Sequence, residues 1–236
     1  MTSLHVNILT LFPEMFPGSL GMSLSGKALD KGLWSYECVN IRDFATDVHK
    51  SVDDTPFGGG AGMVMRPDII EKALLSLPDT GRKIYMSPRG KPLTQNLVQK
   101  LSKEENLTIL CGRYEGVDQR VLDGHEFEEI SVGDYVLSGG EPAAMILMDA
   151  CIRLLGGVMG NEQTPDEESF SGGLLEYPHY TRPAQWTDAN GQTQSVPDIL
   201  SSGHHEKIGK WRLEQSEKIT QNNRPDLWEA YKKQKK

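Results

Sequence analysis

Short apolar runs alternate with amphipathic stretches along the first two thirds of the chain. In residues 67–77 and 93–101 the apolar side chains recur every three or four positions, which is the spacing of a helix packed on one face. Thr94 stands where a helix N-cap is expected. Further helices are predicted at 23–32 and 143–155, and strands at 5–11, 33–41, 82–86, 107–110, 128–132 and 136–140. Strands that alternate with helices indicate an α/β domain with a mostly parallel sheet.

Glycines follow several of these predicted strands. Gly112 ends the run at 107–110, Gly133 ends the run at 128–132, and Gly139-Gly140 close the last extended piece. A similar turn, Ser87-Pro88-Arg89-Gly90, follows the strand at 82–86. In open α/β sheets ligands bind outside the carboxyl ends of the strands. The sequence therefore predicts a binding site at this edge, supplied with polar groups by Arg113, Glu115 and Asp134.

Two other glycine-rich stretches carry different expectations. Residues 53–62 hold four glycines within five positions and predict a mobile loop that approaches a planar ligand closely. Gly21 to Lys27 has the GxxxxGK spacing of a phosphate-binding loop, but Ala28 replaces the hydroxyl residue that binds Mg²⁺. The preceding strand also ends too early, so we expect a helix here, which disfavours a P-loop nucleotidase.

The character of the chain changes after Leu155. Residues 156–183 contain five glycines, three prolines and an acidic run, which is the composition of a linker. We predict that this linker is disordered in the absence of a ligand. Beyond it, residues 196–202, 204–220 and 225–232 predict helices. These helices are expected to pack into a small second domain through Trp211 and Leu213 or through Trp228 and Tyr231.

Charge is distributed unevenly over the 236 residues, whose formal net charge is −8. Residues 204–236 carry nine Lys/Arg and five Asp/Glu, a net charge of +4, and the remaining 203 residues carry 16 basic and 28 acidic groups, a net charge of −12. A basic tail on an acidic body permits a local phosphate-binding face.

Neither an apolar run of membrane-spanning length nor a signal-like start is found, so a cytoplasmic protein is expected. Cys38, Cys111 and Cys151 lie in apolar segments without CxxC spacing. They predict reduced core residues rather than disulfides or a zinc site.

Six motifs, in order and at natural spacing, connect the chain to a known family. They are LTLFPEMF at 9–16, DDTPFGGGAGMVMRP at 53–67, YMSPRGKPLTQ at 85–95, LCGRYEGVDQRV at 110–121, EISVGDYVLSGGE at 129–141 and GLLEYPHYTRP at 173–183. Over nearly its whole length the chain resembles the bacterial tRNA (guanine-N1-)-methyltransferases, SPOUT-class enzymes that modify guanosine at tRNA position 37.

The resemblance implies an α/β fold of SPOUT type, with a mostly parallel sheet, a deep trefoil knot and a small α-helical C-terminal domain. It divides the chain into a knotted catalytic domain at 1–156, a flexible linker carrying the base at 157–178, and a tRNA-binding domain at 179–236. It also implies S-adenosylmethionine as cofactor and a homodimer. The implied cofactor-binding residues are Tyr85, Met86, Ser87, Pro88, Gly112, Tyr114, Glu115, Gly116, Val132, Gly133, Asp134, Tyr135, Val136, Leu137, Gly139 and Gly140.

Methylation of guanine N1 requires a base for its proton and a cation near O6, where negative charge develops. The resemblance assigns these roles to Glu168 and Arg153. Because the family pattern has Asp-Ser-Phe where this chain has Glu168-Ser169-Phe170, Asp166 and Glu167 stay open as alternative bases. Glu176 stands where relatives often carry Asp near a proposed Mg²⁺, which leaves dependence on this metal open.

Substrate contacts are also implied by the resemblance. Gly58, Gly59, Arg113 and His179 are expected to contact the target base and its neighbour, and the basic C-terminal helices to contact anticodon-stem phosphates. No membrane partner is expected. Two other functions stay open: a SPOUT methyltransferase acting on another RNA, and an RNA-binding relative without catalytic activity.

Overall fold

The computed structural model describes residues 3–159, 168–170 and 172–235. The chain forms two compact units, Met1–Glu162 and Gln163–Lys236, each described by itself below. The expected boundaries at 156 and 178 stay predictions, as does the disordered linker, because residues 160–167 and 171 lie outside the described part of the chain.

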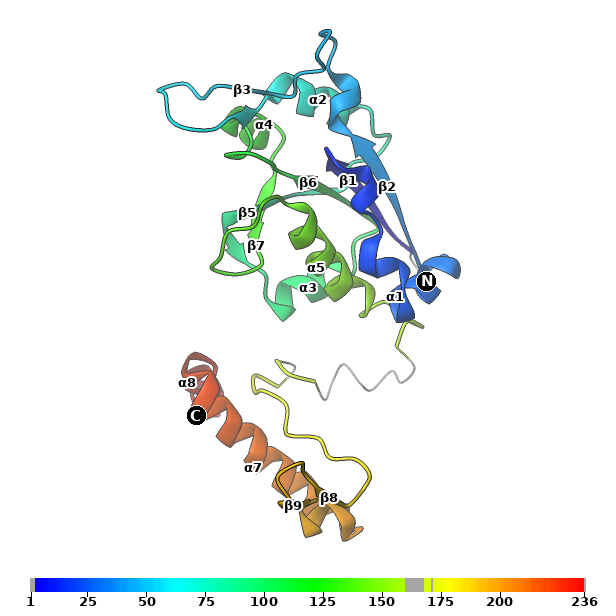
Figure 1. Cartoon of the computed structure of the whole chain (residues 1–236), viewed down its shortest axis with the longest axis vertical. Helices are drawn as coiled ribbons and strands as arrows, with labels where there is room; N and C mark the ends of the chain where they lie inside the picture. Colours follow the sequence, from blue (N-terminus) through cyan, green and yellow to red (C-terminus); the bar gives the residue numbers. More distant parts are fainter. Residues whose placement is uncertain (1–2, 160–167, 171, 236) are drawn as a thin grey trace. The chain divides into compact units, whose positions relative to one another are not determined.

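A five-stranded sheet forms the centre of the first unit (Figure 1). Its strand order is β2-β1-β6-β5-β7, and every pairing is parallel. The strands are β1 (Leu4–Thr10), β2 (Trp34–Asn40), β5 (Arg82–Pro92), β6 (Asn106–Cys111) and β7 (Glu128–Ser131). A separate antiparallel pair, β3 (Asp53–Asp54) and β4 (Val64–Met65), flanks the glycine-rich loop. The predicted α/β class with a parallel sheet is confirmed.

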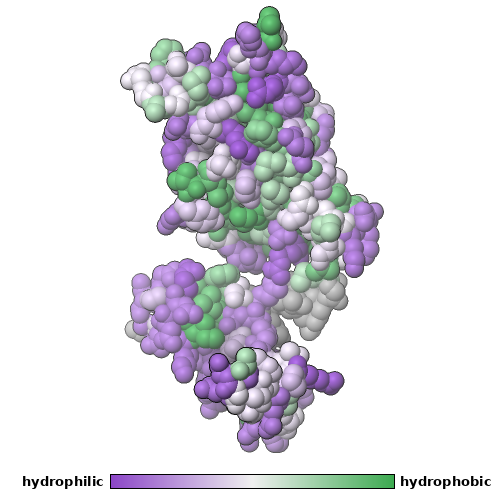
Figure 2. All heavy atoms as spheres, in the orientation of Figure 1, coloured by the Kyte–Doolittle hydropathy of each residue, from purple (hydrophilic) through white to green (hydrophobic). Residues whose placement is uncertain are grey.

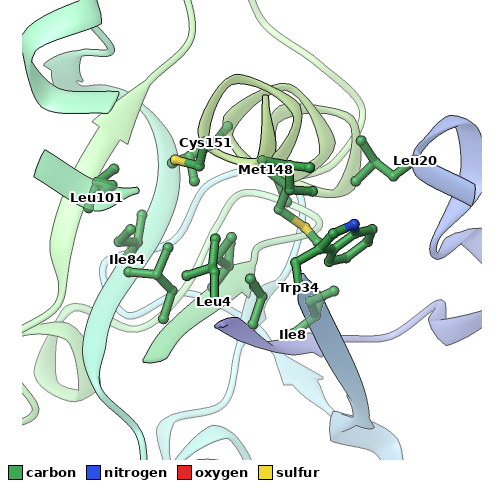
Figure 3. Packing of buried hydrophobic residues seen from close by; sticks show 14 of the residues in the cluster. Leu4, Ile8, Leu20, Trp34, Ile84, Leu101, Met148 and Cys151 are labelled. Atoms are coloured by element: carbon green, nitrogen blue, oxygen red, sulfur yellow. The ribbon is translucent and has the colours of Figure 1, made fainter. Parts of the chain in front are cut away.

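Helices cover both faces of this sheet (Figure 1). Side chains alternate between the two faces along each strand. Leu4 and Ile8 of β1 therefore pack with α1, α3 and α5, whereas Leu9 packs on the other face with α2 and α4. Figure 3 shows the first of these cores, with Trp34 and Met148 side by side. The helices are α1 (Ser23–Asp30), α2 (Pro67–Leu75), α3 (Gln95–Leu101), α4 (Gln119–Gly124) and α5 (Glu141–Ile152), with short 3-10 turns η1 (Pro13–Met15), η2 (Gly18–Gly21) and η3 (Ile41–Phe44).

Local signals at helix starts behave as the sequence indicates. The Thr94 hydroxyl accepts a hydrogen bond from Leu97 N at 3.3 Å, which confirms the predicted cap of α3. The P-loop-like stretch forms η2 and α1, with Gly26 inside the helix against the backbone of Gly21. No phosphate-binding loop forms there, so the predicted helix is confirmed.

Two predictions at strand ends were wrong. Residues 87–90 were predicted to form a turn after a strand, but they belong to β5, which continues to Pro92. The register of β5 shifts within this stretch, so that both Met86 and Lys91 pair with Ile130. Residues 136–140 do not form a strand. They form an irregular segment at the sheet edge instead, where Gly140 N donates a hydrogen bond to Gly112 O, just after β6, at 2.9 Å.

The second unit contains the predicted C-terminal helices. Trp228 and Tyr231 stack with ring centroids 5.8 Å apart, and Tyr180 packs against Trp211. The helix expected at 196–202 is only a 3-10 turn, and Gly203, in the left-handed conformation, follows it and ends the helical backbone. A hairpin that the sequence did not indicate closes around Gly191. The elements are β8 (Gln185–Thr187), β9 (Thr193–Ser195), η4 (Asp198–Ser201), α7 (His205–Asn223) and α8 (Pro225–Gln234).

The three cysteines are free thiols, as expected. Cys111 and Cys151 are fully buried, and Cys38 is half-buried. None of the helices in the described ranges is long and apolar enough to cross a membrane.

Burial should make these thiols slow to react in the folded protein. It raises the pKa of Cys151 to about 12 and, helped by Glu37, that of Cys38 to about 11. Because only the thiolate is nucleophilic, we expect little reaction with a thiol reagent at pH 8. Raising the pH toward 10 should label Cys38 before the others. Titration in guanidinium chloride should release all three thiols, and rapid labelling of all three in native protein would contradict the burial.

Candidate functional site

A cavity of about 210 Å³ lies beside the irregular middle of β5 and the carboxyl ends of β6 and β7. Three segments line it: the end of the regular part of β5, the turn after β6, and the segment that follows β7. All the expected cofactor residues except Asp134 contribute to this lining; Asp134 lies in the same loop with its side chain exposed. Ile130, Ser131, Ser138 and Ala143 also line the cavity, and sequence reasoning did not name them. The parallel register, which brings the strand ends to one edge, places these distant segments together.

The glycines of this edge allow close packing of neighbouring side chains. A β-carbon on Gly112 would lie 2.8 Å from the Tyr85 hydroxyl, and one on Gly133 would overlap the Tyr135 ring. On Gly140 it would lie 2.8 Å from Cys111 Cα, which is backbone and cannot move aside. The cavity therefore combines exposed backbone with apolar walls. Burial raises the pKa of Tyr85, so its hydroxyl stays a hydrogen-bond donor.

Arg113, expected to contact the substrate, forms part of the cavity wall. Its Nε lies 2.9 Å from a carboxylate oxygen of Glu141, which is fully buried at the start of α5. Its Nη1 donates a hydrogen bond to Ser138 O at 3.3 Å. Sequence reasoning did not select Glu141. Its only sequence signal was its position directly after Gly139-Gly140, at the end of the family motif at 129–141.

Gly58 and Gly59 lie in the loop between β3 and β4, outside the cavity lining. Both have positive φ, and neither has another group near the position of a β-carbon. The far end of the loop joins the cavity segment, because Glu115 N donates to Met63 O and Met65 N donates to Gly116 O, both at 2.9 Å. The structure therefore fixes the C-terminal end of this loop beside the cavity and leaves its tip exposed.

Glu168, Glu176 and Arg212 line a cavity of about 310 Å³ within the second unit. His179 Nε2 lies 2.9 Å from Glu176 Oε1, and the Arg212 guanidinium lies 4.7 Å from the centre of the Tyr177 ring. Sequence reasoning did not select Arg212, whose position on a basic helix was its only signal. Arg153 belongs to the first unit, at the C-cap of α5. The alternative bases Asp166 and Glu167 lie outside the described residues.

Comparison with known proteins assigns the chain to a family. A family model described as tRNA (Guanine-1)-methyltransferase TrmD matches residues 4–230. The chain belongs to the TrmD family. It is 60% identical over 230 residues to a tRNA (guanine-N(1)-)-methyltransferase of Rhodospirillum rubrum, covering 97% of this chain and 94% of the relative. A tRNA (guanine-N(1)-)-methyltransferase of Brucella ovis is 57% identical over 232 residues, covering 98% and 94%.

This result confirms the family resemblance drawn from the six motifs. The parallel sheet and C-terminal helices agree with the SPOUT fold of the TrmD family. The knot stays a prediction. The hydrogen bond from Gly140 to Gly112 brings the segment that follows β7 to the end of β6, and β5 lies between these two strands in the sheet. TrmD-family enzymes use S-adenosylmethionine. The cavity fits its purine, since glycine turns present backbone groups between apolar walls such as Met86, Val136 and Leu137.

Dependence on Mg²⁺, which the resemblance leaves open, finds no support in the described residues. Within the described ranges, no group of three or more His, Cys, Asp or Glu side chains is arranged to hold a metal ion. Glu176 pairs with His179 and shares its cavity with Glu168.

Gly140→Ala should damage the cavity and the fold together. The residue has φ of −77°, so alanine is sterically allowed locally, and the cost comes from overlap with the backbone of Cys111 and Gly112. We expect a loss of roughly 1–3 kcal/mol in unfolding free energy, typical of overpacking, and at least about tenfold weaker S-adenosylmethionine binding.

Gly124→Ala is the matched control, because no atom lies near the position of its β-carbon. Chemical denaturation and calorimetric titration of both variants would measure the two effects. If both variants showed the same unfolding free energy and the same affinity for S-adenosylmethionine, the close approach at Gly140 would not matter for either property.

Proposed function

We propose that this protein transfers a methyl group from S-adenosylmethionine to N1 of guanosine 37 of tRNA, next to the anticodon. The observation that carries the proposal is membership of the TrmD family together with the cavity formed by the family's own motifs. Bound S-adenosylmethionine supplies the electrophilic methyl group. A tRNA substrate also leads us to infer a cytoplasmic site of action.

In this proposal Glu168 removes the N1 proton. A carboxylate within hydrogen-bond reach of a ring N–H is a suitable general base at neutral pH. Glu168 lies on the wall of an open cavity together with Glu176 and Arg212. A guanine ring can therefore approach its carboxylate from solvent. Glutamate keeps the chemistry of the aspartate that the family pattern has at this position, with a longer reach.

Arg153 stabilises the negative charge that spreads to guanine O6 as the proton leaves. A guanidinium stays protonated at any physiological pH and offers donors in a fixed plane, which suits a developing oxyanion. Arg153 follows the last turn of α5, where carbonyl groups point outward and a cation is favoured. Gly58, Gly59, Arg113 and His179 are proposed to hold the target base and its neighbour.

The basic helices α7 and α8 are proposed to bind tRNA phosphates. Several of their cations already form exposed ion pairs, Arg224 with Asp226 at 2.6 Å and Lys235 with Glu217 at 3.0 Å. Exposed pairs of this kind contribute little to stability. A phosphate can therefore replace the carboxylate at small cost, and binding should weaken steeply with added salt.

We further propose that the enzyme acts as a homodimer. Apolar side chains reach the surface of the first unit (Figure 2), among them Leu24 of α1 and Ile146 of α5. The short turn η2 packs against both helices, so these side chains lie on neighbouring elements. Most of the remaining α5 surface is buried against the sheet. Exposed apolar residues on adjacent helices suit an isologous interface.

Methyl transfer to transcripts that carry guanosine or adenosine at position 37 tests the reaction. We expect incorporation of labelled methyl only with guanosine. Glu168→Gln should reduce kcat by about 100-fold or more, since a general base contributes roughly that much. Glu105→Gln changes an exposed glutamate that lines neither cavity and should keep kcat within about twofold of wild type. Full activity of Glu168→Gln would move the base to Asp166 or Glu167, and no transfer with either transcript would reject the proposed reaction.

Ile146→Glu tests the dimer. A charge at the centre of an apolar interface should dissociate it, so light scattering should report about half the wild-type mass. Leu75→Glu places the same charge on an exposed apolar site of α2, on the opposite face of the sheet, and should leave the mass unchanged. A monomeric wild type, or an unchanged mass for Ile146→Glu, would refute an interface at this helix.

A further inference from the structure

Arg113 of the cavity wall is paired with a buried carboxylate, Glu141, to which the proposed mechanism gives no role. Glu141, the first residue of α5, has no exposed surface. One carboxylate oxygen accepts a hydrogen bond from the Thr10 hydroxyl at 2.7 Å, and the other lies 2.9 Å from Arg113 Nε, an ion pair without hydrogen-bond alignment. Thr10 is itself fully buried at the end of β1.

A buried carboxylate is an expensive way to hold a fold together. Removing the charges from water costs free energy that their mutual attraction only partly returns, so an apolar pair of similar size is often as stable. The position at the N-terminus of α5 reduces this cost, because the helix dipole favours a negative charge there. A buried pair beside the cavity is therefore better suited to fixing the position of a side chain than to adding stability.

The geometry that Glu141 fixes is that of the Arg113 guanidinium. This group donates from Nη1 to Ser138 O, and its carbon lies 4.3 Å from the centre of the Phe12 ring. It also fills the space beside Gly139, where a β-carbon would overlap it. Arg113 is therefore held on one side by Glu141 and on the others by Phe12 and by the backbone of the segment after β7.

We propose that Glu141 is a positioning residue that acts through Arg113. By fixing the guanidinium, it holds the segment 137–140 as one wall of the cofactor cavity and presents Arg113 to the substrate base. The inference rests on the proposed function, because Arg113 is a substrate contact only if the cavity serves methyl transfer. Glu141 itself lies beneath the wall and is not proposed to touch either substrate.

A double-mutant cycle separates this role from plain stabilisation. Glu141→Gln removes the charge but keeps its shape and an oxygen that can accept from Thr10. We expect kcat/KM for tRNA to fall by about tenfold or more, the scale of a small displacement of a substrate contact. Arg113→Ala should produce a similar or larger loss. The double variant should be no worse than Arg113→Ala alone, because Glu141 has no further effect once Arg113 is absent.

The matched control is Glu128→Gln. Glu128 pairs with Arg82 at 2.7 Å near the amino ends of β7 and β5. Neither residue lines the cavity. This variant should keep kcat/KM within about twofold of wild type, as expected for a residue remote from the chemistry. Unfolding free energies of all variants, measured alongside, show how much stability each pair contributes.

Losses in kcat/KM that multiply in the double variant would overturn the proposal, and so would wild-type activity in Glu141→Gln. Affinity for S-adenosylmethionine is the second readout on the same proteins. A wild type that binds this cofactor without methylating tRNA would reject the proposed function. The same cycle would then be evaluated with the affinity for S-adenosylmethionine. An affinity of the double variant equal to that of Arg113→Ala would support the coupling of Glu141 to Arg113, and losses of affinity that multiply would overturn it.

Discussion

The close approach of Gly140 to the end of β6 determines both the cavity and the helix that follows it. Gly140 N bonds to Gly112 O, and no side chain fits at Gly140 against the backbone of Cys111. The next residue begins α5, whose Leu147 and Cys151 are fully buried in the core of that face. The contact that closes the cavity thus also aligns a major core helix. A disturbance of either one is transmitted to the other because interiors are tightly packed.

The glycines of the cavity serve their neighbours as well as a ligand. Tyr85, Arg113 and Tyr135 occupy the space that side chains on Gly112, Gly139 and Gly133 would need. Glycine at these positions therefore lets large functional side chains close on the backbone. This arrangement explains how a small cavity can combine exposed backbone groups, apolar walls and a buried ion pair within a few residues of one another.

Electrostatics differ between the two units. The first holds its central charges in buried or partly buried pairs, such as Arg113 with Glu141 and Arg82 with Glu128. The second carries the net positive C-terminal segment, whose ion pairs are exposed. Buried pairs resist screening by salt, whereas exposed pairs exchange readily with other ions. The first arrangement preserves a geometry, and the second suits reversible binding of a polyanion.

The sequence alone determined the strands and helices whose apolar spacing is regular, the cap at Thr94 and the family motifs that surround the cavity. These depend on neighbours along the chain, so local spacing contains the information. Residues 136–140 were mistaken for a strand because their apolar character was visible but the absence of a pairing strand was not. Only the tertiary structure decided that β5 continues past Ser87, that Gly191 turns a hairpin, and that Glu141 meets Arg113 and Thr10. Thr10 and Glu141 are 131 residues apart, and their contact follows from the order of the strands in the sheet, which no local pattern specifies.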